Sequence, residues 1–246
     1  MPFDLGPLAT LWMALGLFTA AYVRGYSGFG FAALVVSSAS LVTNPLHFVP
    51  VVILADFLLT GMQARQIWGH IDWTRAGMLF LGCLIGVPLG VSAITAVGID
   101  VARAAIAMFI LAMCGILLAG WTMDRPAGKP ANALVGVISG IANGAAVGGL
   151  PVAAFFSAQP IKAATFRATL IAYFTALDLW TLPNMARAGF VTRDTLVATA
   201  ISMPILFLGV WLGSRHFLRA DPQGFRRFAI YLLASLSILS LIKALL

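Results

Sequence analysis

Charge is scarce in this sequence, and glutamate is missing altogether. Only 9% of the 246 residues are charged, and all eight acidic residues are aspartates. Soluble domains carry about 25% charged residues. A chain of this length that is 61% hydrophobic has more apolar surface than one soluble core can bury. The composition therefore excludes a soluble globular domain and predicts a polytopic membrane protein in the bacterial inner membrane.

Cysteine is also scarce, and this excludes further classes of protein. Cys83 and Cys114 both lie inside apolar runs, and the sequence has no CxxC motif and no Cys/His cluster. We therefore expect neither a disulfide framework nor a metal site, and no cofactor. The net charge of +7 comes without interleaved basic and aromatic residues, so nucleic acid is not an expected partner. No positive charge precedes the apolar run that begins at Leu8, so no cleaved signal peptide is expected.

Long apolar runs are abundant, and six of them are uninterrupted. Each is about 20 residues long, enough to cross a hydrocarbon core of about 30 Å. They are residues 46–64, 76–97, 102–121, 163–183, 195–214 and 228–246.

Two further apolar regions, 8–42 and 133–158, are interrupted by glycine-rich turns. The arms of the second region, 133–142 and 146–158, are too short to span, because ten helical residues rise only about 15 Å. Both regions are predicted to be broken or re-entrant helices. The longer arms of the first leave two thin spans as an alternative.

Weak internal similarity divides the chain into two halves. The matching pairs are Gly25 with Gly140, Pro45 with Pro160, Gly69 with Gly189, Gly86 with Gly209 and Gly90 with Gly213. Each half is an irregular hairpin followed by three spans, and this odd number of crossings inverts the second half. We predict an all-α polytopic membrane protein made of two inverted repeats, 1–121 and 132–246, with 122–131 as a polar linker. Interrupted helices at matching positions are typical of secondary transporters.

The basic residues predict the orientation in the membrane. One side of the predicted topology holds nine of them: Arg65, Arg75, Arg125, Lys129, Lys162, Arg215, Arg219, Arg226 and Arg227. The other side holds four: Arg103, Arg187, Arg193 and Lys243. Because cytoplasmic loops are enriched in Lys and Arg, the first side is predicted to be cytoplasmic, and both termini are predicted to be periplasmic.

Several glycine motifs occur in a distinctive order along the chain. GYSGFGFA at 25–32, the block GVISGIANGAAVGGLPVAAFFSAQPIKAATFRATLIAYF at 136–174, and GHIDW at 69–73 followed by GxPxG at 86–90 together resemble the TauE/SafE family of sulfite exporters. The resemblance covers nearly the whole chain. It implies export or uptake of sulfite, an organosulfonate or a related organic anion. One departure is that 144–149 reads GAAVGG where many relatives have a GGG run.

The two glycine-rich turns are the predicted substrate site. Helices starting at Ser27–Gly28 and near Asn143–Gly144 direct bare N–H groups and positive dipole ends at the turns, and such ends bind anions. Close helix packing through small residues is the alternative role for these glycines. The predicted substrate-binding residues are Arg24, Gly25, Tyr26, Ser27, Gly28, Phe29, Gly30, Asn143, Gly144, Gly148, Gly149 and Arg167.

Four charged residues fall within apolar sequence, where charge is costly and indicates function. Arg24 is predicted to supply the fixed positive charge of the site. For Arg24 and Arg167, snorkelling to an interface is the alternative. Asp56 and Asp178 fit either proton coupling or ion pairing with an arginine, and ion pairing is preferred. The expected partners are thus a small anion, the lipid bilayer, and a proton or sodium ion for coupling.

Two other functions are compatible with parts of the sequence. Gly25-Tyr26-Ser27-Gly28 matches GxSG, the serine motif of rhomboid intramembrane proteases, whose chemistry needs an intramembrane histidine as base. His216 is expected at a cytoplasmic helix end, so that base is missing. An anion channel is the second alternative, and concentrative or pH-dependent flux distinguishes a carrier from it. We predict a transporter and not an enzyme.

Overall fold

The computed structural model describes residues 2–217 and 222–245, and every regular element within these ranges is a helix. The predicted all-α fold is therefore confirmed. The helices of the first half are α1 (Pro7–Ser27), α2 (Phe31–Ser40), α3 (Phe48–Ile67), α4 (Trp73–Thr95) and α5 (Ile99–Ala119). Those of the second half are α6 (Lys129–Asn143), α7 (Gly149–Ser157), α8 (Ala163–Arg187), α9 (Arg193–Phe217) and α10 (Pro222–Leu245). Arg219, counted above for the orientation, lies outside the described residues.

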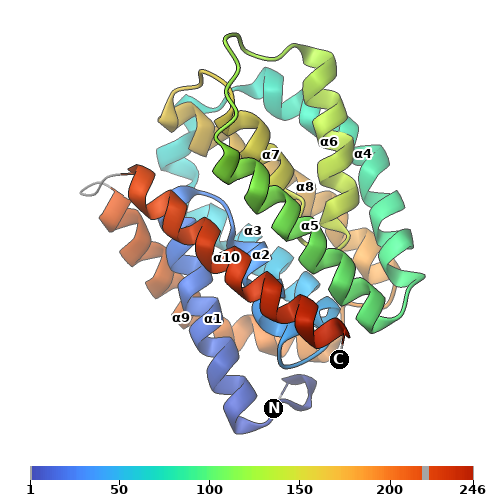
Figure 1. The fold of residues 1–246 in the computed structure, drawn as a ribbon. Coiled ribbons are helices and arrows are strands. Elements are labelled where there is room, and N and C mark those ends of the chain that lie inside the picture. The colour runs from blue at the N-terminus through green and yellow to red at the C-terminus, as the bar shows by residue number, and fades with distance from the viewer. Residues whose placement is uncertain (1, 218–221, 246) are drawn as a thin grey trace.

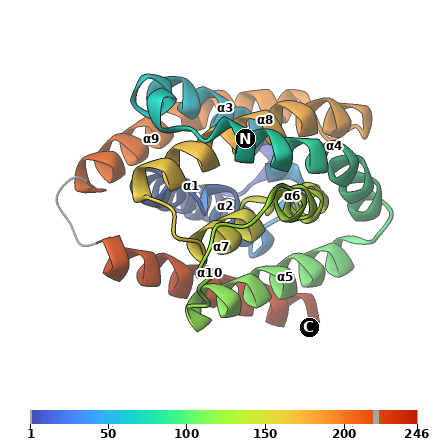
Figure 2. The same cartoon turned by 90° about the horizontal axis from the view of Figure 1, so that it is seen from above.

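The two hairpins with short arms occupy the middle of the molecule. In Figure 2, α1, α2, α6 and α7 lie between α5 and α10 on one side and α3, α4, α8 and α9 on the other. The α2 helix has 10 residues and α7 has 9, so each rises only about 15 Å. The N-terminal end of each therefore lies inside the protein. Irregular backbone at this depth is tolerated in a membrane protein only where protein or a polar cavity surrounds it.

Each hairpin begins and ends at one end of the molecule. The ring of Phe3, just before α1, stacks on His47, just after α2, with centroids 5.2 Å apart. The second hairpin closes in the same way, because the backbone N–H of Ala127 donates to Oε1 of Gln159 at 2.9 Å. Both interrupted regions are therefore helical hairpins whose two ends lie together at one end of the molecule.

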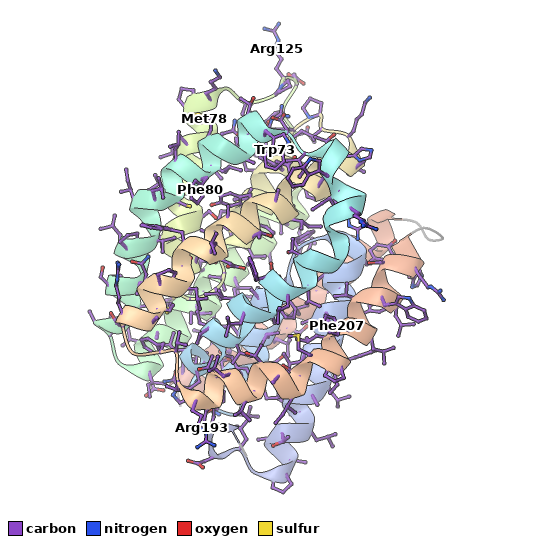
Figure 3. All side chains as sticks on the ribbon, turned by 180° about the vertical axis from the view of Figure 1, so that it is seen from behind. Trp73, Met78, Phe80, Arg125, Arg193 and Phe207 are labelled. Carbon is purple, nitrogen blue, oxygen red and sulfur yellow. The ribbon has the colours of Figure 1, made fainter. Side chains whose placement is uncertain are left out.

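The two hairpins enter from opposite ends. The chain termini lie together at one end in Figure 1, and Lys243 Nζ donates there to the carbonyl of Leu41 at 2.5 Å. The linker between the halves lies at the other end, where the Met123 N–H donates to the Ala158 carbonyl at 2.6 Å. Figure 3 shows Arg125 and Arg193 at these two opposite ends.

The outer surface suits a bilayer. Among the described residues, four helices are long and apolar enough to cross a membrane, at Pro7–Tyr26, Trp73–Thr95, Ile99–Ala119 and Arg193–His216. Leucines such as Leu81 and Leu89 on α4 are more than half exposed. Exposed tryptophans gather toward the linker end, where Trp68 packs edge-on against Trp73 and Arg215 stacks over Trp211 at 3.9 Å. Tryptophan is typical of membrane–water interfaces.

Glycines bring two pairs of helices into backbone contact. On α4, a Cβ atom added at Gly82, Gly86 or Gly90 would overlap the backbone of α6, and the same holds for Gly136 and Gly140 of α6 against α4. Small residues at four-residue spacing permit such close packing between membrane helices. The same close backbone contact joins α1 and α9, with Gly25 against Val210 and Gly213 against Tyr22. We call these two contacts the α4–α6 seam and the α1–α9 seam.

Helix contacts recur between the halves. The α4–α6 contact has its counterpart in α1–α9, and α4–α8 has its counterpart in α3–α9. The α3–α8 and α5–α10 contacts each join two helices that hold the same place in the order of the two halves.

Candidate functional site

The first helix break is a sharp turn of three residues. Helix α1 ends at Ser27, and Gly28 follows with φ of 80°, its N–H donating to the Arg24 carbonyl at 2.8 Å. Gly30 has φ of 87° and precedes α2. Because glycine adopts this left-handed conformation readily, it commonly terminates a helix. The prediction of a helix starting at Ser27–Gly28 is therefore wrong, and the helix start lies at Phe31.

The second break is longer and contains a strained alanine. Helix α6 ends at Asn143 and α7 begins at Gly149, so the helix predicted to start near Asn143–Gly144 starts five residues later. Between them, Ala146 has φ of 56°. A non-glycine residue in this region costs about 1–3 kcal/mol, and such residues cluster at functional sites.

A cavity of about 40 Å³ lies between the two breaks. One water needs about 10–15 Å³ by this measure, so the space fits a few waters or a small oxyanion. Both halves contribute its lining, which consists of Arg24, Gly28, Phe29, Gly30, Phe31, Ala32, Ala33, Asp56, Asn143, Ala146, Val147, Gly149, Leu150, Phe174, Leu177 and Asp178.

The starts of α2 and α7 both reach this cavity, at Phe31 and Gly149. Neither start has a side chain hydrogen-bonded to it as a cap. The first turn of a helix presents N–H groups that lack an intrahelical partner, and the helix dipole adds positive potential there. Two uncapped helix starts therefore direct positive potential into one cavity.

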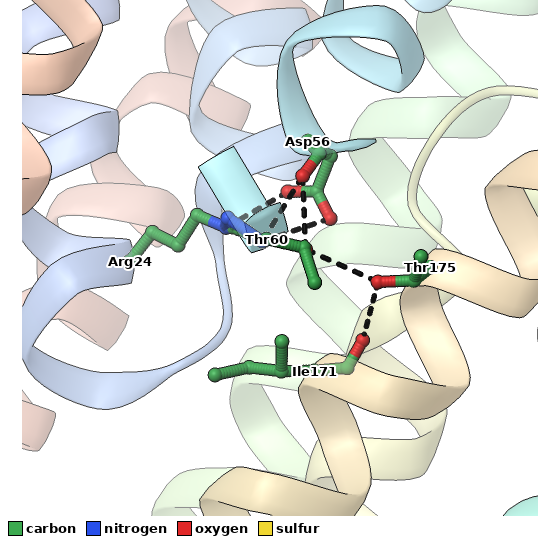
Figure 4. A network of polar contacts seen from close by, with 5 residues as sticks. All are labelled: Arg24, Asp56, Thr60, Ile171 and Thr175. Atoms are coloured by element: carbon green, nitrogen blue, oxygen red, sulfur yellow. Dashed lines mark hydrogen bonds and ion pairs between the residues drawn. The ribbon is translucent and has the colours of Figure 1, made fainter. Parts of the chain in front are cut away.

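Arg24 places a full positive charge in the cavity wall. Its side chain is 2% exposed. Nε lies 2.8 Å from Asp56 Oδ1, and Nη2 donates to Asp56 Oδ2 at 3.1 Å and to Thr60 Oγ1 at 3.0 Å. Thr175 of α8 extends this network by donating to Thr60 Oγ1 at 3.1 Å (Figure 4). The remaining nitrogen, Nη1, is buried and has no hydrogen-bond partner in the described protein.

The second half places an equivalent but uncharged group in the wall. Asn143, at the end of α6, donates from Nδ2 to Thr181 Oγ1 at 2.9 Å and to Asp178 Oδ1 at 3.4 Å. Arg24 and Asn143 thus each lie in the last turn of the helix before a break, and each contacts an aspartate and a threonine. Asp56 and Asp178 line the same cavity.

Eight of the residues singled out from the sequence line the cavity. They are Arg24, Gly28, Phe29, Gly30, Asp56, Asn143, Gly149 and Asp178. Arg24 is buried against Asp56 and does not snorkel to an interface.

Other predicted residues of the first turn lie outside the lining. Gly25 packs on α9, where its carbonyl accepts from Arg167 Nη2 at 3.0 Å and from Ser214 Oγ at 3.2 Å. Tyr26 packs edge-on against His216, 5.6 Å between ring centroids. The side chain of Ser27 lies outside the described part of the chain. Arg167 stands behind the turn, with Cγ so close to Gly28 that a Cβ there would lie 2.9 Å away.

Two glycines of the second turn also serve packing. Gly144 lies against Gly90 of α4, and an added Cβ would overlap backbone there. Gly148 accepts a hydrogen bond from Ser139 Oγ at 2.6 Å through its carbonyl and lies against Asn143. Both residues hold the turn in place without facing the cavity.

Sequence reasoning missed the other eight lining residues, among them Phe174 and Leu177, and the threonines beside them. Thr60 and Thr181 bind Arg24 and Asn143, while Phe174 and Leu177 line the cavity. Helical spacing could have identified Thr60 and Phe174, because residues three and four apart share a helix face. Thr60 follows Asp56 by four residues, and Phe174 precedes Asp178 by four.

The fold and the site define a polytopic membrane protein with a small cavity of mixed charge between two broken helices. The sequence profile of the family described as Sulfite exporter TauE/SafE matches residues 12–240. The chain belongs to this family. Family membership confirms the resemblance noted from the motifs and makes the protein a transporter and not an enzyme, so the serine-protease alternative is wrong.

One curated relative extends the comparison. The chain is 27% identical over 237 residues to a "Probable sulfite/organosulfonate exporter TauE" of Cupriavidus necator, and the match covers 91% of this chain and 89% of the relative. No solved structure matches the chain.

Proposed function

We propose that this protein moves sulfite, an organosulfonate or a related small organic anion across the bacterial inner membrane by alternating access around the central cavity. Its substrate-binding groups are Arg24, the turn at Gly28–Gly30 and the start of α7 at Gly149. The relative's name supports the substrate class. The chemistry of the cavity wall supports an anion independently of that name.

The observation that carries the proposal is the free nitrogen of Arg24. A buried guanidinium donor without a partner costs free energy, and an oxyanion removes that cost by accepting from it. The neighbouring N–H groups at the start of α2 can bind further oxygens of the same anion. Phe29, Phe174 and Leu177, which line the same cavity, suit the carbon chain of an organosulfonate.

Alternating access is supported by the relation between the two halves. We propose that residues 1–121 and 132–246 are inverted repeats, since the two hairpins enter from opposite ends and the helix contacts exchange between halves. Transporters of this kind hold the substrate where the repeats meet and rock one part against the other. The cavity lies between the two breaks, as this mechanism requires.

Transport by purified protein in liposomes tests the proposal, with Gly149→Val as the site variant. A Cβ at Gly149 would lie 3.1 Å from the Phe174 ring, so valine fills the cavity while displacing only side-chain atoms. We expect the folded variant to lose at least about nine-tenths of methanesulfonate flux, because steric exclusion removes the space for the anion. Gly115→Val is the matched control, since Gly115 on α5 faces open space.

Native flux in Gly149→Val would remove this cavity from the transport path. Accumulation of labelled methanesulfonate by counterflow distinguishes a carrier from an anion channel, because a channel only equilibrates its substrate. Equilibration without counterflow would favour the channel.

The proposed orientation is tested by cysteine labelling in intact cells. Ala188 precedes Arg193 by five residues and Thr122 lies next to Met123 in the linker, so these two exposed residues belong to the opposite ends that Arg193 and Arg125 mark in Figure 3. The native cysteines are buried. Because the basic residues favour cytoplasmic exposure of the linker, a membrane-impermeant maleimide should label Ala188→Cys and leave Thr122→Cys unlabelled until the cells are opened. The reverse pattern would place the termini in the cytoplasm.

A further inference from the structure

The cavity wall holds two buried carboxyl groups and one guanidinium. Arg24, Asp56 and Asp178 all line the cavity, and the aspartates are 6% and 7% exposed. If both carboxyls were ionised, these three side chains would carry a net charge of −1. That arrangement repels an anion and leaves one carboxylate buried without a cation of its own, which is strongly unfavourable.

The contacts distinguish the two aspartates. Both oxygens of Asp56 are occupied by Arg24, at 2.8 Å and 3.1 Å. Asp178 forms no ion pair among the described residues, and its amide partner Asn143 is 3.4 Å away. Asp178 lines the same cavity as the Asp56 carboxylate and, within the described chain, has no cation of its own. An ionised carboxylate in that place is strongly unfavourable, so Asp178 is the group of this wall that holds a proton.

We propose that Asp178 binds the coupling proton, and that one proton and one anion occupy the site and cross the membrane together. This inference rests on the proposed function, because it assigns the driving ion to the same cavity. The protonated Asp178 is neutral, the Asp56 carboxylate stays on Arg24, and Nη1 of Arg24 binds the anion. No covalent bond forms or breaks apart from the transfer of this proton.

The sign of the coupling follows from the charges. With the proton on Asp178, the three wall side chains sum to zero and the positive helix starts dominate the cavity. Without it, the wall is negative and the anion binds weakly. Because linkage is reciprocal, anion binding must draw a proton onto the site. A proton gradient then drives uptake, while a sufficiently steep outward anion gradient drives export of the same pair.

The other ionisable groups packed around Asp178 do not take its place as the proton-binding group. Arg167 on α8 donates to the Gly25 carbonyl behind the turn. Tyr173 on α8 donates to Ser139 of α6, and Cys83 of α4 lies in the apolar core. On α1 and α3 the facing charged groups are Arg24 and Asp56, which are paired with each other.

The test measures proton uptake on anion binding to the purified full chain. Methanesulfonate is the probe, because it stays ionised over the whole working range and any pH dependence belongs to the protein. Calorimetry in two buffers of different ionisation heat should give one proton taken up per anion where Asp178 is ionised in the free protein. In that range the affinity should fall about tenfold per pH unit as the pH rises.

Asp178→Asn is the matched variant, since the amide mimics the neutral carboxyl in size and cannot ionise. We expect it to bind methanesulfonate with affinity that is independent of pH, and to lose proton-driven accumulation in liposomes while retaining anion counterflow. Asp124→Asn is the control, because Asp124 lies exposed in the linker; it should keep the wild-type pH dependence.

Three results overturn the inference. One is wild-type binding without proton uptake at any pH. Another is sodium-dependent binding that takes up no proton. The third is unchanged pH dependence in Asp178→Asn. In each of these cases anion binding persists and the proposed function stands. Absence of methanesulfonate, sulfite and taurine binding at every pH would instead defeat the proposed function itself. The wild-type proton count needs no variant, so it decides the question even if Asp178→Asn folds poorly.

Discussion

Arg24→Ala is expected to weaken methanesulfonate binding about ten- to hundred-fold and to destabilise the protein in the same step. The loss of affinity corresponds to one hydrogen bond from a charged donor, worth about 1.5–3 kcal/mol. The loss of stability has a separate cause. Asp56 is 6% exposed and paired with Arg24 at 2.8 Å, and removing one partner of a buried pair costs about 3–5 kcal/mol. Calorimetric binding and thermal unfolding in detergent measure the two effects.

A second substitution separates binding from stability. Arg24→Ala combined with Asp56→Asn no longer buries an unpaired carboxylate, so most of the lost stability should return while binding stays weak. Arg75→Ala is the matched control. Its partner Asp72 is partly exposed and keeps its hydrogen bond from the backbone N–H of residue 75, so this change should cost at most about 1 kcal/mol.

The conservative change sharpens the same test. Arg24→Lys should recover only part of the affinity, because an ammonium cannot bind Asp56 through two nitrogens and still present a third to the anion. If Arg24→Ala binds methanesulfonate with native affinity, the anion is held by backbone N–H groups alone. In that case Arg24 serves only as the partner of Asp56.

Much of the architecture could be predicted from the sequence. The six uninterrupted spans correspond to α3, α4, α5, α8, α9 and α10, and both glycine-rich turns interrupt helices. These features depend on local composition and on glycine, whose effects act over a few residues. The error in the helix starts was also local. Gly28 and Gly30 both adopt positive φ, so the chain leaves one helix and re-enters the next only after the second glycine.

The chemistry of the site could not be predicted to the same degree. Asp56 lies 32 residues from Arg24 in sequence, and nothing in the local pattern says that these two side chains meet. Whether a glycine lines the cavity or packs against a helix could not be predicted from the sequence either. Gly25 and Gly144 lie beside cavity residues in the sequence, yet both pack against neighbouring helices. Which side of a break faces the cavity depends on the tertiary packing of α4 and α9.

Arg24 of the first half and Asn143 of the second each contact an aspartate on the third helix of their own half, but only Arg24 is charged. A second arginine in place of Asn143 would neutralise both carboxylates. With one arginine, Asp178 has no ion-pair partner among the described residues. Under the proposed function, this difference in charge provides one anion position and one carboxyl that takes up a proton.

The α4–α6 seam holds the second hairpin in place, and Gly86→Ala is expected to disrupt it. A Cβ at Gly86 would meet the Val137 carbonyl and lie 3.0 Å from both Gly140 Cα and Ile141 N, all backbone atoms of α6. Since no side chain can move aside, the helices must separate. Overpacking of this kind costs about 1–3 kcal/mol or more. Separation also shifts Asn143 at the end of α6, so methanesulfonate transport should fall with the melting temperature.

Gly77→Ala is the matched control for the same change, because Gly77 lies on α4 with nothing within 4 Å of an added Cβ. Alanine favours a helix over glycine by about 1 kcal/mol, so this variant should melt at or slightly above the wild-type temperature. Gly213→Ala should behave like Gly86→Ala, because its Cβ would overlap the Tyr22 carbonyl, a backbone atom, in the α1–α9 seam. Equal melting of Gly86→Ala and Gly77→Ala would mean that α4 and α6 do not meet through their backbones, and the position assigned to Asn143 in the site would fall with that contact.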